Sequence, residues 1–84
     1  MTLNNLDIVI TGTLSRMTRK TAFDRIRSEG GFPRKKISGN TDLLVVGQLS
    51  WMSEKLSFAL DNFIDIITEN DFYDLIGEAY EKDM

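Results

Sequence analysis

Residues 8–13, Ile-Val-Ile-Thr-Gly-Thr, constrain the fold more than any other stretch of the chain. A short run of β-branched apolar residues predicts a buried strand, and this run ends abruptly at Thr11-Gly12. A segment with helical character begins a few residues later. A strand that passes through a glycine turn into a helix directs backbone N–H groups and a hydroxyl toward one point, where an anion can bind. The stretch therefore predicts an α/β fold and indicates a candidate anion site.

Apolar patterning predicts the remaining elements. Strands are expected over residues 6–11, 32–34, 43–46 and 64–67. Helices are expected after the N-caps Thr18, Ser53 and Thr68, with apolar stripes formed by Ala22, Phe23 and Ile26, by Leu56, Ala59, Leu60 and Phe63, and by Phe72, Leu75, Ile76 and Ala79. Pro33 confines the second strand to an edge, because proline cannot donate to a neighbouring strand. The order β-α-β-β-α-β-α predicts a mostly parallel sheet with helices on both faces.

The composition bounds both the size and the chemistry of the molecule. A length of 84 residues suits a single domain, 1–84, without room for a second core. The chain has no cysteine and no histidine, which excludes disulfides, thiolate–zinc sites, a cysteine nucleophile and the commonest general base. No apolar stretch approaches the roughly 18 residues of a membrane span, and the N-terminus lacks a signal-peptide pattern. We therefore expect an intracellular protein with no membrane partner.

The net charge of −3 conceals an asymmetry along the chain. Residues 1–40 carry eight Lys and Arg against three Asp and Glu, a balance of +5, whereas residues 41–84 carry two against ten, a balance of −8. Such asymmetry can mark a nucleic-acid contact on the basic side. Charge alone favours the simpler interpretation, in which two solvated faces differ in charge.

Further motifs stand in the order and spacing of a known family. They are Gly30-Gly31, the stretch from Lys36 to Gly47, Ser53-Glu-Lys-Leu56 and the stretch from Ile64 to Phe72. Together with residues 8–13, they make the chain resemble a BRCT domain over nearly its whole length. The resemblance implies a four-stranded parallel sheet, with the first and third helices packed together on one face and the second helix on the other. It also implies a non-catalytic module of DNA repair and replication proteins, in which the glycine pair lets the first helix turn tightly into the second strand.

Two features relate the chain to one subgroup of this family. Many eukaryotic members carry a tryptophan in the last helix, where this chain has Phe72. Gly47, a loop and Ser53-Glu-Lys-Leu56 are similar to a pattern in bacterial NAD-dependent DNA ligases and the large subunit of replication factor C, and some bacterial exonucleases carry such a domain. The loop departs from the glycine-rich version usual in those ligases. Its Trp51 and Met52 either contact a base or a partner, or form a flap over the second helix.

The resemblance also implies a phosphate-binding site. In phosphate-binding BRCT domains, a Ser or Thr that closes the first strand, the next Gly and a Lys that opens the second helix hold the phosphate; by position these are Thr11, Gly12 and Lys55. The subgroup that binds 5′-phosphorylated DNA adds an Arg at the start of the first helix, where Arg19 falls. The chemistry fits, because a hydroxyl, an unobstructed glycine N–H and two cations all bind an anion. Each residue alone also has a purely structural interpretation.

Other charged residues are less specific. Five basic residues are either secondary contacts to a nucleic-acid backbone or solvated surface: Arg16, Lys20, Arg34, Lys35 and Lys36. Five carboxylates lack an EF-hand pattern, and three of them lie near expected helix starts: Asp61, Asp65, Glu69, Asp71 and Asp74. We therefore expect no metal site.

The sequence leaves two functions open. The first is a DNA-binding module that recognises a 5′-phosphate at a DNA end or nick through Thr11, Gly12, Arg19 and Lys55, inside a ligase, clamp loader or nuclease. The alternative is a protein–protein interaction module that binds a phosphopeptide or forms a homodimer, although phosphopeptide binding usually needs a tandem pair of such domains. An enzyme is not expected, because the chain lacks His, Cys and a Walker-type loop. We expect no catalytic residue, no cofactor and a cytoplasmic location, at the nucleoid in a bacterium.

Overall fold

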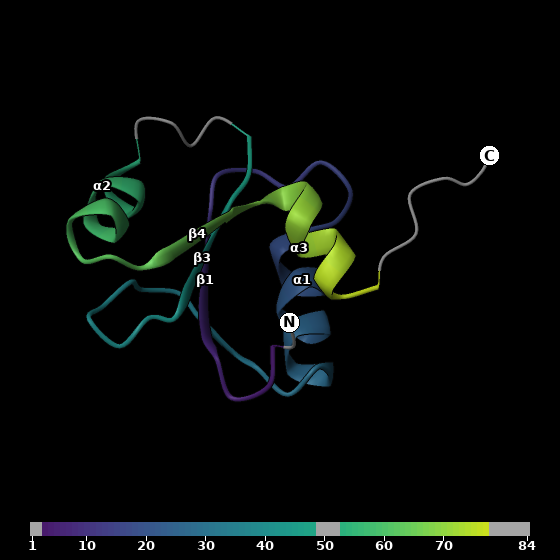
Figure 1. Cartoon of the computed structure of the whole chain (residues 1–84). Coiled ribbons are helices and arrows are strands. Elements are labelled where there is room, and N and C mark those ends of the chain that lie inside the picture. The colour runs from purple at the N-terminus through teal and green to yellow at the C-terminus, as the bar shows by residue number, and fades with distance from the viewer. Residues whose placement is uncertain (1–2, 49–52, 78–84) are drawn as a thin grey trace.

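The computed structural model describes residues 3–48 and 53–77, which form one α/β unit (Figure 1). Its elements are β1 (Asp7–Thr11), α1 (Arg19–Ser28), β2 (Phe32–Arg34), β3 (Leu43–Val46), α2 (Glu54–Asp61), β4 (Asp65–Thr68) and α3 (Glu69–Leu75). The predicted order of strands and helices is confirmed. The three predicted N-caps are also confirmed: the side chains of Thr18, Ser53 and Thr68 each accept from a backbone N–H in the first turn of the following helix.

All four strands run parallel, in the order β2-β1-β3-β4. The register pairs Thr11 with Val46 and Val46 with Thr68, so the carboxyl ends of β1, β3 and β4 lie in one row. β2 is an edge strand, as Pro33 predicts. The two inner strands are β1 and β3, which explains the apolar run Ile8–Ile10 in β1 and the wholly apolar sequence of β3.

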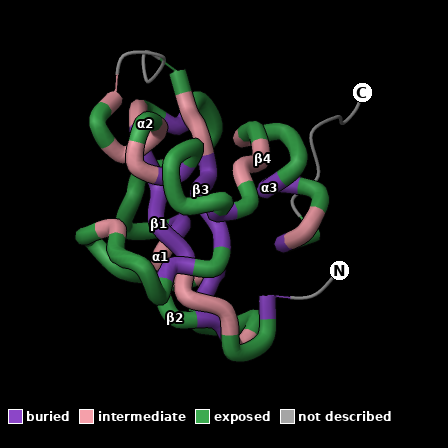
Figure 2. The backbone as a smooth tube through the Cα atoms, turned by 60° about the vertical axis from the view of Figure 1, so that its left-hand side comes forward, coloured by how far each residue is buried: buried purple, intermediate pink, exposed green. Residues whose placement is uncertain are grey.

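Helices cover both faces of the sheet, with α1 and α3 on one side and α2 on the other (Figure 1). Side chains alternate along β1, so that Ile8 and Ile10 pack toward α1 and α3 while Val9 packs toward α2. The larger core cluster combines Leu3, Ile8, Ile10, Leu14, Ala22, Ile26, Leu43, Val45, Phe72, Tyr73 and Ile76. Figure 2 shows buried residues along the inner strands β1 and β3, with exposed residues on most of the connections.

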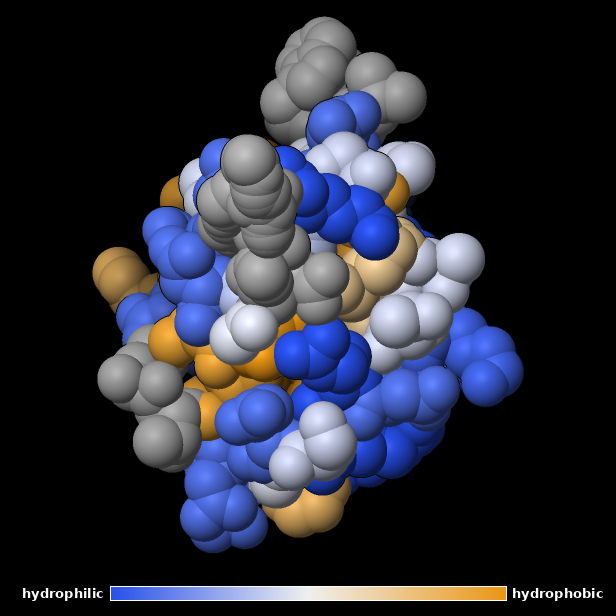
Figure 3. Space-filling model, turned by 90° about the vertical axis from the view of Figure 1, so that its right-hand side faces the viewer, coloured by the Kyte–Doolittle hydropathy of each residue, from blue (hydrophilic) through white to orange (hydrophobic). Residues whose placement is uncertain are grey.

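The face of the molecule on the side of α1 and α3 is mainly hydrophilic, with apolar surface in several separate areas (Figure 3). No helix in the described ranges is long and apolar enough to cross a membrane.

The predicted apolar stripe of α2 is wrong at two positions. Leu60 is 63% exposed and Phe63 is 94% exposed, whereas Ala59 is fully buried. The buried face of α2 is centred on Ala59 and flanked by Leu56 and Phe58. Leu60 lies about 100° around the helix from Ala59 and so turns to the surface. Phe63 lies beyond the end of α2, with a positive φ of 57° that carries it out of the helical path.

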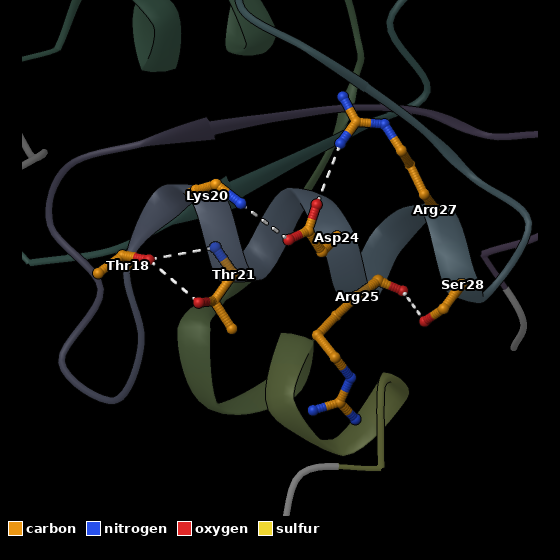
Figure 4. A network of polar contacts seen from close by, with 7 residues as sticks. All are labelled: Thr18, Lys20, Thr21, Asp24, Arg25, Arg27 and Ser28. Atoms are coloured by element: carbon orange, nitrogen blue, oxygen red, sulfur yellow. Dashed lines mark hydrogen bonds and ion pairs between the residues drawn. The ribbon is translucent and has the colours of Figure 1, made fainter.

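The stripe of α3 is confirmed at Phe72 and Ile76, which are buried, and is incomplete because Tyr73 is also fully buried. Ala79 lies outside the described residues. The side chain of Arg25 in α1 points toward α3 (Figure 4). It donates to the carbonyl of Ile76, the residue that caps the end of α3. The packing of α1 against α3 that the BRCT resemblance implies is therefore present.

The glycine pair after α1 makes a close turn possible. Gly30 has φ +85°, a conformation that favours glycine. A Cβ at Gly31 would lie 2.9 Å from both the Leu3 carbonyl oxygen and the Ile26 side chain. Residues with side chains would therefore force α1 away from the start of β2, as expected from the resemblance.

Candidate anion-binding site

Thr11 and Ser53 meet where β1 ends and α2 begins. Thr11 is 4% exposed, and its Oγ1 lies 2.8 Å from Ser53 Oγ although 42 residues separate them. Ser53 is the N-cap of α2 and accepts from the N–H groups of Lys55 at 3.0 Å and Leu56 at 3.4 Å. The segments that follow two neighbouring parallel strands therefore converge at one edge of the sheet, where open α/β sheets generally bind ligands.

The capping bonds favour one direction for the hydrogen bond between the two hydroxyls. A hydroxyl oxygen has two lone pairs and one proton. Because two backbone N–H groups donate to Ser53 Oγ, we infer that the Ser53 proton donates to Thr11 Oγ1. Thr11 consequently keeps its own proton for a further acceptor. The pair presents a hydrogen-bond donor beside the N-terminus of α2, where the helix dipole favours negative charge.

The loop after β1 is held tightly against the loop after β3. Thr13 and Gln48 exchange two backbone hydrogen bonds of 2.9 and 2.8 Å, and Gly47 N–H donates to the Thr11 carbonyl at 2.8 Å. A Cβ at Gly47 would lie 2.6 Å from the Thr13 carbonyl oxygen, so glycine is needed for this approach. Gly12 adopts φ 82°, which turns the chain sharply at the end of β1.

Arg19, the first residue of α1, lies across the same loop. Its two terminal nitrogens donate to the carbonyls of Ile10 at 2.7 Å and Gly12 at 2.8 Å. A guanidinium has five N–H donors, so three remain for other acceptors. Gly12 and Arg19 also line a common hollow of about 430 Å³. Arg19 therefore restrains the loop and places a positive charge beside Gly12.

The four residues predicted for the site are brought together in two pairs. Thr11 is linked through Ser53 to the backbone of Lys55, and Gly12 is linked to Arg19. The side chain of Lys55 lines a different hollow, together with Lys35 and Lys36. Ser53 was predicted only as a helix cap, and nothing in its local sequence indicates that its hydroxyl meets Thr11.

The other basic residues differ in their surroundings. Lys20 and Arg27 both pair with Asp24 on α1, at 3.5 and 3.4 Å (Figure 4). Arg34 pairs with Asp7 at 3.0 Å. Arg16 donates its backbone N–H to the Tyr73 hydroxyl at 3.0 Å. Trp51 and Met52 lie outside the described residues.

Glu69, at the start of α3, binds the loop that connects β1 to α1. Its Oε2 accepts from the Ser15 hydroxyl at 2.6 Å, the Ser15 N–H at 3.0 Å and the Tyr73 hydroxyl at 3.1 Å. Burial by itself would raise the pKa of Glu69, but these hydrogen bonds and the positive charge of Arg16 lower the pKa from its ordinary value. Burial raises the pKa of the Tyr73 hydroxyl. The carboxylate of Glu69 therefore holds the loop between β1 and α1 against α3.

No cluster of three potential metal ligands occurs among residues 3–48 and 53–77.

Comparisons with known proteins identify relatives. The chain matches the BRCA1 C Terminus (BRCT) domain family over residues 2–76. It is 36% identical to a DNA ligase of Petrotoga mobilis over 77 residues, which is 92% of this chain and 11% of the ligase. It is 38% identical to a DNA ligase of Jannaschia sp. and 39% identical to one of Carboxydothermus hydrogenoformans, each over 74 residues, 88% of this chain and 10% and 11% of those ligases. The chain thus spans about a tenth of the length of these relatives. With its parallel sheet and its match over residues 2–76, the chain belongs to the BRCT domain family.

Proposed function

We propose that this BRCT domain is a non-catalytic module of a DNA repair or replication protein and binds a phosphate of DNA, at a 5′ end or a nick. Thr11 donates its hydroxyl, Gly12 its N–H, and Arg19 and Lys55 supply positive charge. The observation that carries the proposal is the Thr11–Ser53 pair, since Ser53 leaves Thr11 with a proton to donate at the start of a helix.

The relatives add support of a different kind. They are named DNA ligases, and a ligase acts on DNA ends. A module that holds a 5′-phosphorylated end would serve such an enzyme, with the catalytic chemistry carried by other parts of the parent protein. Such a module would act inside the cell, at the nucleoid in a bacterium. The overall charge of −3 indicates that the affinity for DNA is modest and depends on the basic half of the chain.

A protein–protein interaction is the second candidate function. The specific observation in its favour is the exposed apolar end of α2, where Leu60 and Phe63 are 63% and 94% exposed. Two large apolar side chains exposed at one end of a helix offer a surface that a partner could cover. A homodimer would use this surface, whereas a phosphopeptide would compete for the anion site itself.

The test is a titration of the 84-residue chain at low salt with two DNA duplexes that differ only in a recessed 5′-phosphate. Thr11→Val keeps the shape of the buried side chain and removes the hydroxyl. We expect tighter binding of the phosphorylated duplex, and we expect Thr11→Val to reduce this preference about tenfold or more, the size of one hydrogen bond to a charged group. Thr21→Val, at an exposed position on α1, is the matched control. Equal binding of the two duplexes by the unaltered chain would overturn the proposal.

The same chain distinguishes the second candidate. If a phosphoserine peptide displaces the phosphorylated duplex, the ligand of the anion site is a phosphorylated protein and not DNA. A hydrodynamic mass of two chains that returns to one with Phe63→Ser would establish dimerisation through the end of α2.

A further inference from the structure

Lys35, Lys36 and Lys55 line one hollow of about 390 Å³, here called the lysine hollow. Lys35 and Lys36 follow β2, and Lys55 lies in the first turn of α2. The hollow is also lined by Ile37 and Phe58, which are partly buried against the smaller core cluster, and by Glu54. The lysine hollow therefore combines an apolar lining anchored in the core with positive charge.

The positive charge of the lysine hollow is not neutralised by ion pairs. In the described part of the chain, none of the three lysines forms an ion pair, whereas Lys20 and Arg27 share Asp24. Among the described residues that line the hollow, Glu54 is the one carboxylate, so these residues together carry a net charge of +2. A domain with a net charge of −3 therefore keeps a concentrated positive patch at this place.

The lysine hollow adjoins the anion site. Lys55 belongs to both, because its backbone N–H donates to Ser53 Oγ, which in turn bonds to Thr11. Lys35 also lines a second hollow of about 490 Å³ that includes Arg19 and Phe23. Positive side chains thus extend from Arg19 at the start of α1, through Lys35 after β2, to Lys55 at the start of α2.

We propose that the lysine hollow binds the sugar–phosphate backbone of the DNA strand next to the phosphate held at Thr11. The inference rests on the proposed function and adds the path of the strand beyond the end phosphate. Lysine ammonium groups bind successive phosphates without reading the sequence, and the apolar lining of Ile37 and Phe58 contacts the deoxyribose. Glu54 opposes this binding, since its carboxylate lies in the path of a polyanion.

The first test is a gain of affinity, which loss of folding cannot produce. Glu54→Gln removes the opposing charge, and we expect it to tighten binding of both duplexes about two- to fivefold at low salt, the effect of one surface charge. Asp61→Asn makes the same charge change at the other end of α2 and is expected to leave binding unchanged. Equal effects of the two variants would mean that only the net charge matters, and would overturn the proposal.

The second test separates the lysine hollow from the anion site. Lys35→Gln/Lys36→Gln should weaken both duplexes alike, keep their affinity ratio and reduce the slope of log affinity against log salt by about 1.8, or about 0.9 for each lost contact. Lys20→Gln/Arg27→Gln removes two charges that border the second hollow but are paired with Asp24, and it should change the slope less than the loss of Lys35 and Lys36. An unchanged slope for the first variant overturns the lysine hollow and leaves the preference for the 5′-phosphate standing. If the unaltered chain does not prefer the 5′-phosphorylated duplex but the lysine substitutions still reduce the slope, the proposed phosphate site at Thr11 is overturned instead. If neither duplex binds, both proposals are overturned.

Discussion

Replacement of Ser53 by alanine tests the central contact of the site. Ser53 caps α2 through two backbone N–H groups and bonds to the Thr11 hydroxyl. Loss of an N-cap costs about 0.5–2 kcal/mol, and loss of a hydrogen bond costs about 0.5–1.5 kcal/mol. We therefore expect Ser53→Ala to lower the free energy of unfolding by about 2 kcal/mol. For a domain of this size, that change lowers the Tm by about 8–16 °C.

A second helix cap separates the stability due to the Thr11–Ser53 hydrogen bond from the stability due to capping alone. Thr68 caps α3 through a single bond from the Asp71 N–H at 3.2 Å, and no contact links its side chain to Thr11 among the described residues. In urea denaturation followed by circular dichroism, the double-mutant cycle of Ser53→Ala with Thr11→Val should give a coupling of about 1 kcal/mol. The cycle of Thr68→Ala with Thr11→Val should give none. A coupling below about 0.3 kcal/mol in the first cycle would refute the hydroxyl pair.

The same substitution has a consequence for binding. Ser53 is a positioning residue, because its proton orients the Thr11 hydroxyl toward the ligand. Ser53→Ala should therefore reduce the preference for the 5′-phosphorylated duplex, while Thr68→Ala, a loss of stability of similar origin, should not. Ser53→Thr keeps the hydroxyl and should restore the preference. A Ser53→Ala variant that is folded and keeps the full preference would contradict this role.

Three further predictions concern the surrounding structure. The pKa of Glu69 in the folded chain lies below its ordinary value of 4.5. Its charge therefore stabilises the fold above about pH 4.5, and this contribution is lost as the pH falls through the folded pKa. Glu69→Gln should flatten the acid side of the curve of stability against pH, measured by thermal unfolding. Gly47→Ala places a Cβ 2.6 Å from the Thr13 carbonyl and should cost about 1–3 kcal/mol in urea denaturation, whereas Gly39→Ala, with open space around it, should cost less than about 1 kcal/mol. Phe63→Ser should leave the Tm within about 3 °C, because this side chain is 94% exposed.

Local signals predicted the elements well because each depends on a few neighbouring residues. The caps Thr18, Ser53 and Thr68 bond within three residues of themselves, and the glycine turns depend on backbone conformation at one position. The central parts of β1 and β3 are apolar and mostly β-branched, so the inner placement of these two strands follows from composition. These features are visible in the sequence without knowledge of the tertiary packing.

The misassigned positions depend on packing that periodicity does not encode. Leu60 fits a helical stripe but turns to the surface because the small Ala59 marks the centre of the buried face of α2. Tyr73 has a polar group and was not assigned to the core, yet its hydroxyl is satisfied by Glu69 and by the Arg16 N–H, which permits burial.

The site residues illustrate the same limit. Thr11, Gly12, Arg19 and Lys55 were proposed from resemblance, and they stay predictions as phosphate ligands. What the sequence could not indicate is the manner of their linkage: a hydroxyl bond across 42 residues and an arginine that donates to two main-chain carbonyls. Such long-range contacts arise only when parallel pairing brings the strand ends together.

These long-range contacts also bear on how selective the site can be. The loop that carries Gly12 is restrained by the backbone pair of Thr13 with Gln48, by Arg19 on two carbonyls and by Glu69 on Ser15. A ligand that binds there need not order the loop, so more of the interaction free energy appears as affinity. A rigid donor set also rejects acceptors of the wrong geometry, which favours a tetrahedral phosphate dianion over a planar, singly charged carboxylate. The lysine hollow, by contrast, carries its charge on long, flexible lysine side chains. We therefore expect it to add affinity for DNA without distinguishing the end of a strand from its interior.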